Sequence, residues 1–278
     1  MTGDARAFVS KSGDDGPGFS FGHYPAAIPT ALRFYDTCKT GALKPYDLFT
    51  MINSDPVLTG ITYGLYHEFF PEIPQIFFGL TQIIIKLNIN TVKNHVLKAL
   101  ERAIPPEKAG KGIVDKQADF LRRSLAAGMV SLLLAKRRGL AVRDIQKYYC
   151  AGLLHDIGGF VLLEGSGAGF DGLTPEKAGL LAAKLWGFPS VIHDVIAFHR
   201  NHRRYTGEHA DVVCHTALSV SILDKWEAAK SSEESLSQAS ATDKLFKLLN
   251  LDKGILEGIE ESFRAEFKKT AAFIGLGD

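Results

Sequence analysis

Residues 150–159, from Cys150 to Gly159, read CAGLLHDIGG and lie near the middle of the chain. His155 and Asp156 are adjacent polar side chains inside this otherwise apolar run. Buried polar groups cost free energy unless they are paired, so some group must face this dipeptide in the fold. In a metallohydrolase that group is a divalent cation, held by imidazole and carboxylate, which activates a bound water. The structural alternative is a hydrogen-bonded pair that only fastens two helices together.

The composition limits the classes to which the protein can belong. Of its 278 residues, 46% are hydrophobic and 10% aromatic, which suffices for a packed core and argues against global disorder. The 32 Lys and Arg residues are balanced by 31 Asp and Glu residues. Proteins that hold nucleic acid by neutralising phosphates normally show a basic excess. We therefore expect no DNA partner.

The cysteines and the apolar windows predict a cytoplasmic protein. Cys38, Cys150 and Cys214 are odd in number and far apart, so neither a disulfide framework nor a zinc ribbon is indicated. Residues 1–20 lack the apolar stretch of a signal peptide. The most apolar window, residues 73–89, is interrupted by Gln and Lys and is too polar to span a bilayer. We expect reduced thiols and no membrane partner.

Helical periodicity and helix-start signals run through the chain. Asp55 and Pro56 are placed as the N-cap and first residue of a helix over residues 57–70, and Thr174 with Pro175 marks another start. Asp144 is predicted to cap a helix that continues into the His-Asp pair. We find no convincing strand, so the predicted fold class is all-α.

Four segments are expected along the chain. They are a flexible Gly-rich leader over residues 1–22, an N-terminal helical subdomain over residues 23–106, an HD-like helical bundle over residues 107–230, and a C-terminal helical extension over residues 231–278. The boundaries follow the Pro pair at 105–106 and the Ser-rich segment at 231–240.

The order of several motifs resembles a known family. Residues 24–29 read YPAAIP, 52–59 read INSDPVLT, 151–158 read AGLLHDIG, and 185–189 read LWGFP, followed by IAFH at 196–199. Together they resemble the HDOD domain, the HD-related output domain of bacterial signalling proteins, over residues 23–230. The resemblance implies a multi-helix HD-like bundle with an N-terminal helical subdomain.

The resemblance also implies that the metal-ligand set is incomplete. HD phosphohydrolases add a first histidine on the preceding helix and an aspartate on a later helix, and two-metal relatives add one more histidine. Arg123 stands at the first position and Lys177 near the last one, while residues 213–217, VCHTA, contain no carboxylate. Only His155, Asp156 and His199 remain as potential ligands. Like charges near 4 Å repel by about 4 kcal/mol at an effective dielectric constant near 20, so two cationic side chains disfavour a dication.

Arg123 suggests a replacement for the missing cation. We hypothesise that its guanidinium forms a buried ion pair with Asp156, which would cost about 3–5 kcal/mol to break from one side. The alternative is that Arg122 and Arg123 both extend to solvent, as arginines usually do.

Two other constellations carry weaker signals. Cys214 and His215 could join His155 in a zinc site, but adjacent helical residues do not face one another. Cys150 could be a thiol nucleophile with His155 as its base, but five residues along a helix do not place the two side chains face to face, and no third group is evident to orient the base.

These observations predict a non-catalytic HDOD-type module with no cofactor, whose partner is a signalling protein or a small ligand. Arg122, Arg123 and Lys177 would favour an anion such as the phosphate of a nucleotide. The alternative is a metal-dependent phosphohydrolase of the HD superfamily that uses substitute ligands.

Overall fold

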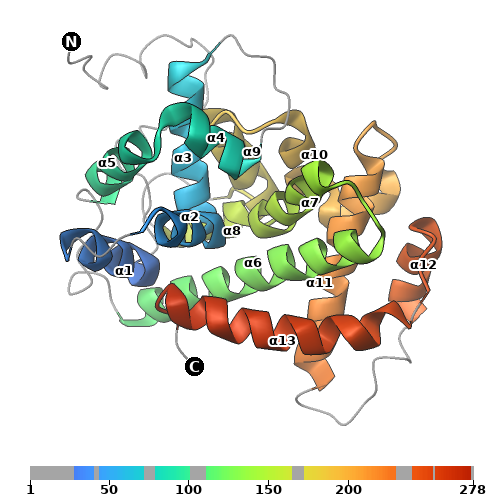
Figure 1. The fold of residues 1–278 in the computed structure, drawn as a ribbon. Helices are drawn as coiled ribbons and strands as arrows, with labels where there is room; N and C mark the ends of the chain where they lie inside the picture. The colour runs from blue at the N-terminus through green and yellow to red at the C-terminus, as the bar shows by residue number, and fades with distance from the viewer. Residues whose placement is uncertain are drawn as a thin grey trace.

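The computed structural model describes residues 28–40, 44–71, 79–100, 111–164, 172–229, 240–252 and 254–276. The described residues are predominantly helical and contain no strand, which confirms the predicted all-α class. The helices, drawn in Figure 1, are α1 (Ile28–Lys39), α2 (Pro45–Ser54), α3 (Pro56–Phe69), α4 (Leu80–Leu87), α5 (Ile89–Leu100), α6 (Lys111–Arg137), α7 (Val142–Leu154), α8 (Ile157–Glu164), α9 (Pro175–Leu185), α10 (Ser190–Phe198), the 3-10 helix η2 (His199–Arg204), α11 (Ala210–Ala229), α12 (Ser240–Leu248) and α13 (Ile255–Phe273).

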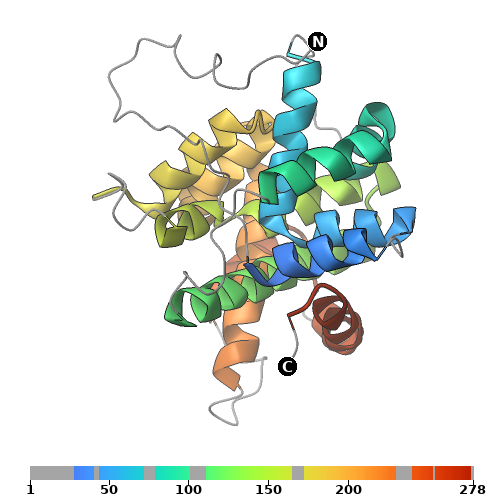
Figure 2. The ribbon, with the colours of Figure 1, turned by 90° about the vertical axis from the view of Figure 1, so that its left-hand side faces the viewer.

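Helices α6 and α7 form the centre of the bundle. Figure 2 shows α1–α5 on one side and α8–α10 on the other, while α11 crosses α6 steeply in both views. Buried apolar side chains from all of these helices join in one continuous core. The predicted leader lies outside the described residues, as do both internal boundaries, at 106–107 and 230–231. The division into segments therefore stays a prediction.

Small residues set how closely α6 and α7 approach. A Cβ atom at Gly152 would lie 2.6 Å from the carbonyl oxygen of Ala127, so only glycine permits this contact. One turn further along α6, Ser131 donates a 2.8 Å hydrogen bond to Ser219 of α11, and the carbonyl of Ser131 faces His215. The long central helix is thus fixed on two sides by polar as well as apolar contacts.

Two of the three predicted helix starts are correct. The side chain of Asp55 accepts hydrogen bonds from the backbone N–H groups of Val57 and Leu58, and Thr174 caps α9 in the same manner. Asp144 was expected to cap α7, but the N-cap is Ala141 and Asp144 lies in the first turn. A carboxylate there still favours the positive end of the helix.

The chain turns at the His-Asp dipeptide. Helix α7 ends at Leu154 and α8 begins at Ile157, so the helix does not continue through His155 and Asp156 as predicted. Gly158 then packs against the backbone of α9 with no room for a side chain. This turn directs His155 into the core and Asp156 toward the ends of α9 and α10.

Helix α13 lies along α6 on the outside of the bundle (Figure 1). Its inner face includes Ile259 and Phe263, both at most 9% exposed. The C-terminal part of the chain thus contains helices α12 and α13, and α13 packs on the central helix.

Candidate functional site

His155 is buried at the end of α7, with 2% of its surface exposed. Its Nδ1 lies 2.8 Å from the carbonyl oxygen of Gly152, and because a carbonyl can only accept, Nδ1 carries the proton. Burial, and then the neighbouring His199, lower the pKa of His155 to about 3. The imidazole is therefore neutral at physiological pH, with Nε2 as its acceptor atom.

His199 meets His155 edge to face, with ring centroids 5.0 Å apart and an interplanar angle of 90°. It follows the last residue of α10, and its Nδ1 lies 2.9 Å from the carbonyl oxygen of Val195. Burial lowers the pKa of His199 as well. Two neutral imidazoles with the same tautomer thus meet beside Asp156.

The cation that faces Asp156 is Arg200. Its Nη2 donates to both carboxylate oxygens of Asp156, at 2.9 and 3.0 Å, and its Nε donates to Nε2 of His199 at 3.3 Å. The same Nε lies 3.8 Å from a carboxylate oxygen of Glu176. We call the group formed by His155, Asp156 and His199 the HD centre. A guanidinium therefore bridges the carboxylate and one imidazole of this centre.

The predicted pair between Arg123 and Asp156 does not form. Arg123 pairs instead with two carboxylates of α11, Asp224 and Glu227, the latter at 3.1 Å, and 37% of its side chain is exposed. Burial lowers the pKa of Arg123, but these two partners, and more weakly the charge of Asp156, outweigh burial and raise it. Arg123 thus lies beside the centre without contacting Asp156.

Helix α11 brings a carboxylate to Arg123. Residues 213–217, where the resemblance places the later aspartate, contain no carboxylate, but Asp224 lies further along the same helix and pairs with Arg123. Helices α6 and α11 are also joined by the hydrogen bond from Ser131 to Ser219.

Lys177 lies in the first turn of α9 with an exposed side chain. Among the described residues, no contact joins its side chain to His155, Asp156 or His199. The residue of this turn that does reach the centre is Glu176, through Arg200. The sequence analysis identified neither Glu176 nor Arg200 as a site residue. The position of Arg200 directly after His199 could have indicated that it lies near the HD centre.

The remaining candidate sites are not assembled in the described part of the chain. His215 donates from Nε2 to the carbonyl of Ser131 at 2.9 Å, and its Nδ1 faces Arg138 at 3.0 Å, so it has no role beside His155. Nowhere in the residues that the structure describes do three His, Cys, Asp or Glu side chains form a group that could hold a metal ion.

Cys150 is not an activated thiol. The side chain is 2% exposed beside Tyr63, and burial raises its pKa to about 12. Since the thiolate is the nucleophile, this cysteine is chemically inert at neutral pH.

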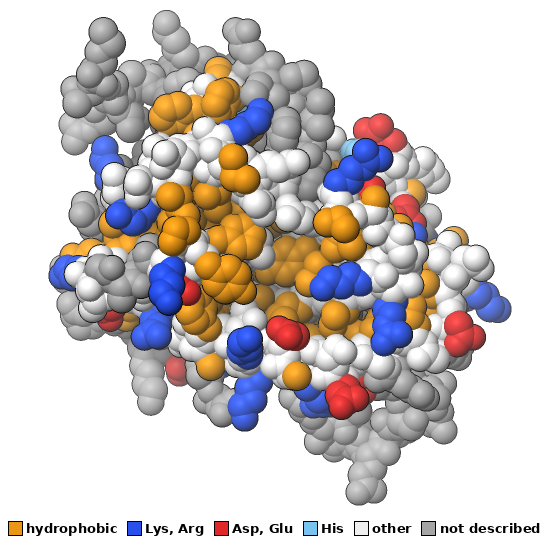
Figure 3. All heavy atoms as spheres, viewed as in Figure 1, with side chains coloured by type: hydrophobic (Ala, Val, Ile, Leu, Met, Phe, Trp, Pro, Cys, Tyr) orange, Lys and Arg blue, Asp and Glu red, His pale blue; other side chains and the backbone are white. Residues whose placement is uncertain are grey.

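No helix in the described residues is long and apolar enough to cross a membrane. The charged side chains on the face shown in Figure 3 are scattered among hydrophobic and neutral surface and form no continuous basic patch.

Comparisons with known proteins agree with the motifs. No curated protein matches the chain. A solved structure of the MmoQ response regulator from Methylococcus capsulatus str. Bath is 16% identical with a TM-score of 0.61, and the match covers 85% of this chain and 97% of that one. An HDOD domain protein from Geobacter sulfurreducens is 15% identical with a TM-score of 0.42, covering 90% and 93%. The first likeness shows a shared fold.

The model of the HDOD domain family matches residues 78–176, a range that includes α6, α7 and the His155-Asp156 turn. The motifs at 52–59 and 185–189 lie on either side of it. The part of the chain that contains the His155-Asp156 turn therefore matches the HDOD domain, as the motifs indicated.

Proposed function

We propose that the protein is a non-catalytic signal transduction module that acts through protein contacts or by binding a small ligand. The observation that carries this proposal is the position of Arg200, which bridges Asp156 and His199 where an HD hydrolase would hold its cation. A fixed guanidinium at this place satisfies the carboxylate and repels a dication, by about 4 kcal/mol for two unit charges at 4 Å in an effective dielectric constant of 20.

The match of residues 78–176 to the HDOD domain and the fold shared with a response regulator support a signalling role. The HD centre would then be structural: it joins the end of α7 to α9 and α10 through Asp156, Glu176 and Arg200. The centre's surroundings would suit an anion, because Arg123 lies beside it.

One observation favours the alternative, a metal-dependent phosphohydrolase. His155 and His199 both fix Nδ1–H on a backbone carbonyl and remain neutral, which is how metal-ligating histidines are usually oriented. The carboxylate of Asp156, the third potential ligand, is bound to Arg200.

Metal analysis and a hydrolysis assay separate the two functions. We expect purified protein to contain no stoichiometric transition metal and to leave bis(p-nitrophenyl) phosphate intact in the presence of Mn²⁺. Arg200→Ala removes the competing charge and should bind Mn²⁺ at least about tenfold more tightly than the wild type, since about 1.4 kcal/mol corresponds to a factor of ten. Under the proposed function this variant should still not hydrolyse the phosphodiester.

Arg203→Ala is the matched control, because Arg203 is exposed on the same 3-10 helix and makes no contact with Asp156. It should bind Mn²⁺ as the wild type does. If the wild type contained about one equivalent of metal and hydrolysed the phosphodiester, the proposal would be wrong and the protein would be a phosphohydrolase.

A further inference from the structure

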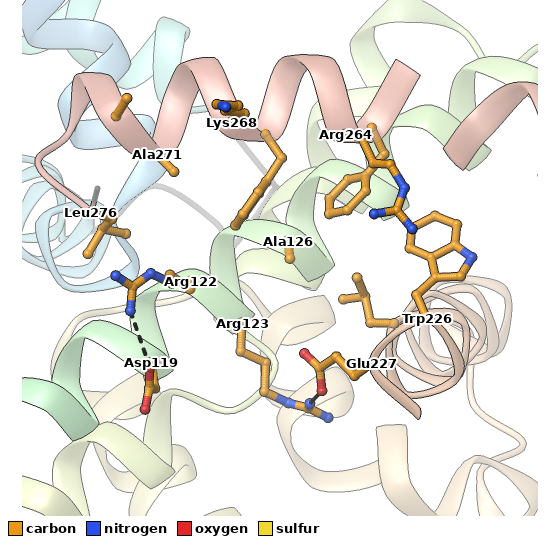
Figure 4. A pocket seen from close by; sticks show the side chains of 14 residues that line it. Asp119, Arg122, Arg123, Ala126, Trp226, Glu227, Arg264, Lys268, Ala271 and Leu276 are labelled. Carbon is orange, nitrogen blue, oxygen red and sulfur yellow. Dashed lines mark hydrogen bonds and ion pairs between the residues drawn. The ribbon is translucent and has the colours of Figure 1, made fainter. Parts of the chain in front are cut away.

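A cavity of about 840 Å³ lies between α6, α11 and α13, and Arg123 is among the residues that line it (Figure 4). Its volume falls within the range of pockets that hold small molecules, about 300–1,000 Å³. Helix α13, which forms one wall, lies outside the part of the chain matched by the family model. The cavity is therefore built partly by the C-terminal extension of this chain.

Aromatic rings form the apolar part of the cavity. The rings of Trp226 and Phe263 have centroids 5.1 Å apart at 31°, and those of Phe263 and Phe267 lie 5.2 Å apart at 30°. Leu223 and Leu276 complete the apolar lining. The row of nearly parallel rings ends with Phe267, which is only partly buried and so offers a ring to a bound molecule. Such a surface suits a flat aromatic group, which stacks on side chains of this kind.

The rest of the lining is charged and mainly basic. Four cationic residues line the cavity, against the two acidic residues Asp119 and Glu227; the four are Arg122, Arg123, Arg264 and Lys268. Arg122 pairs with Asp119 at 3.2 Å, and Arg123 pairs with Glu227 at 3.1 Å. These pairs are solvent-exposed, and exposed ion pairs contribute little free energy, so an entering anion can displace the carboxylates.

We propose that this cavity binds a nucleoside phosphate. The base would stack on Phe267, at the end of the row of rings. Phosphate oxygens would take the place of carboxylates on Arg122 and Arg123, since guanidinium groups bind phosphate oxygens with paired hydrogen bonds. An aromatic floor with cationic walls matches both halves of such a ligand. The bounded volume favours a small molecule over an acidic helix of a partner protein, which would need a long open groove.

Arg123 gives the bound ligand a route to the rest of the fold. Its present partners, Asp224 and Glu227, join α6 to α11, and its charge also acts on His155. A phosphate on Arg123 would exchange with these carboxylates and so change the contact between α6 and α11. The role of this event as a signal rests on the proposed function, whereas binding itself does not.

The test is a titration of the full chain with AMP, ATP, GMP and GTP up to about 1 mM, measured by calorimetry. Tryptophan fluorescence gives a second signal in a Trp186→Phe background, in which only Trp226 remains. Adenosine, guanosine and inorganic phosphate are the controls. We expect at least one nucleotide to saturate, and its nucleoside and phosphate alone to bind at least about tenfold more weakly. Chromatography of the mixture should recover the nucleotide unchanged, and its hydrolysis would count against the non-catalytic function but not against this site.

Two variants locate the site. Arg122→Glu should weaken binding of that nucleotide by at least about tenfold, whereas Lys136→Glu, the same charge reversal at an exposed position of α6 outside the cavity, should change it less than about twofold. Phe267→Ala should weaken nucleotide binding but leave the response to inorganic phosphate unchanged. If Arg122→Glu does not fold, Arg122→Gln provides the same comparison. The proposal is overturned if no nucleotide saturates, or if nucleoside and nucleotide bind equally well. It is also overturned if the two charge reversals have equal effects on binding. Binding of an acidic peptide in place of a nucleotide would identify the cavity as a protein-docking site.

Discussion

Gly158→Ala is expected to lower the free energy of unfolding by about 3 kcal/mol or more. The added Cβ atom would lie 1.8 Å from the carbonyl oxygen of Pro175 and 2.4 Å from the backbone nitrogen of Gly179. Both are backbone atoms of α9, so no side-chain rotation can relieve the overlap. The variant must separate α8 from α9, which opens gaps in a core that is otherwise closely packed.

Gly159→Ala is the matched control, one residue further along the same helix. There the nearest atom is a carboxylate oxygen of Asp156 at 3.6 Å, which is an ordinary contact. Because alanine is the better helix former by up to about 1 kcal/mol, this variant should be as stable as the wild type or slightly more stable. Urea denaturation followed by circular dichroism at neutral pH measures both changes. Equal stability of the two variants would show that α8 can shift away from α9 without cost.

This packing also bears on the HD centre. Asp156 precedes α8, and Glu176 lies in the first turn of α9, so the closeness of the two helices helps to bring both carboxylates to Arg200. Gly158, two residues after Asp156, therefore helps to fix the position of Arg200 at the HD centre. We propose that Arg200 in this position excludes a cation.

Much of the fold follows from local signals in the sequence. The apolar spacing of three and four residues predicts helices, and Asp55 and Thr174 mark two of their starts because the capping hydrogen bonds join residues only two or three positions apart. Asp144 misled the prediction because an acid in the first turn and an acid at the N-cap look alike in sequence. Only the backbone at Ala141 separates the two possibilities.

The candidate site could be predicted only in part. His155, Asp156 and His199 were identified from motifs, and the two imidazoles do meet. The predicted partner of Asp156, Arg123, was wrong. The actual partner is Arg200, which lies 44 positions from Asp156 in the chain and reaches it only because of how α9 and α10 pack. Arg123 points to α11 instead, where Asp224 lies 101 positions later in the chain. Such partners follow from the rotation and register of packed helices, which a single sequence does not specify.

Asp55 should make the protein lose stability as the pH rises from about 4 to about 7. Burial raises its pKa to about 6, although hydrogen bonds from Thr30, Leu58 and Val57 oppose this shift. In the unfolded chain the pKa is about 3.9. The folded state thus binds the proton more tightly, so this contribution to stability is complete below about pH 4 and is lost as the pH passes through about 6. Two pKa units correspond to about 3 kcal/mol.

Asp55→Asn separates the charge of this residue from its capping role. The amide oxygen can still accept from Val57 and Leu58, and the amide nitrogen can donate to the hydroxyl of Thr30, so the cap remains without a buried charge. We expect this variant to match the wild type near pH 4 and to exceed it by about 2–3 kcal/mol near pH 7.

Asp55→Ala should be less stable than the wild type near pH 4, by about 2–4 kcal/mol, because it leaves the same buried N–H groups without a partner. This difference should shrink by about 3 kcal/mol near pH 7, because only the wild type loses stability as Asp55 ionises. Urea unfolding of the three proteins at the two pH values gives the comparison. If the asparagine variant were the less stable one near pH 7, the attraction between the carboxylate and the positive end of α3 would outweigh the cost of burial. The DPVLT motif would then be stabilised by the charge of Asp55 and not merely by the shape of its side chain.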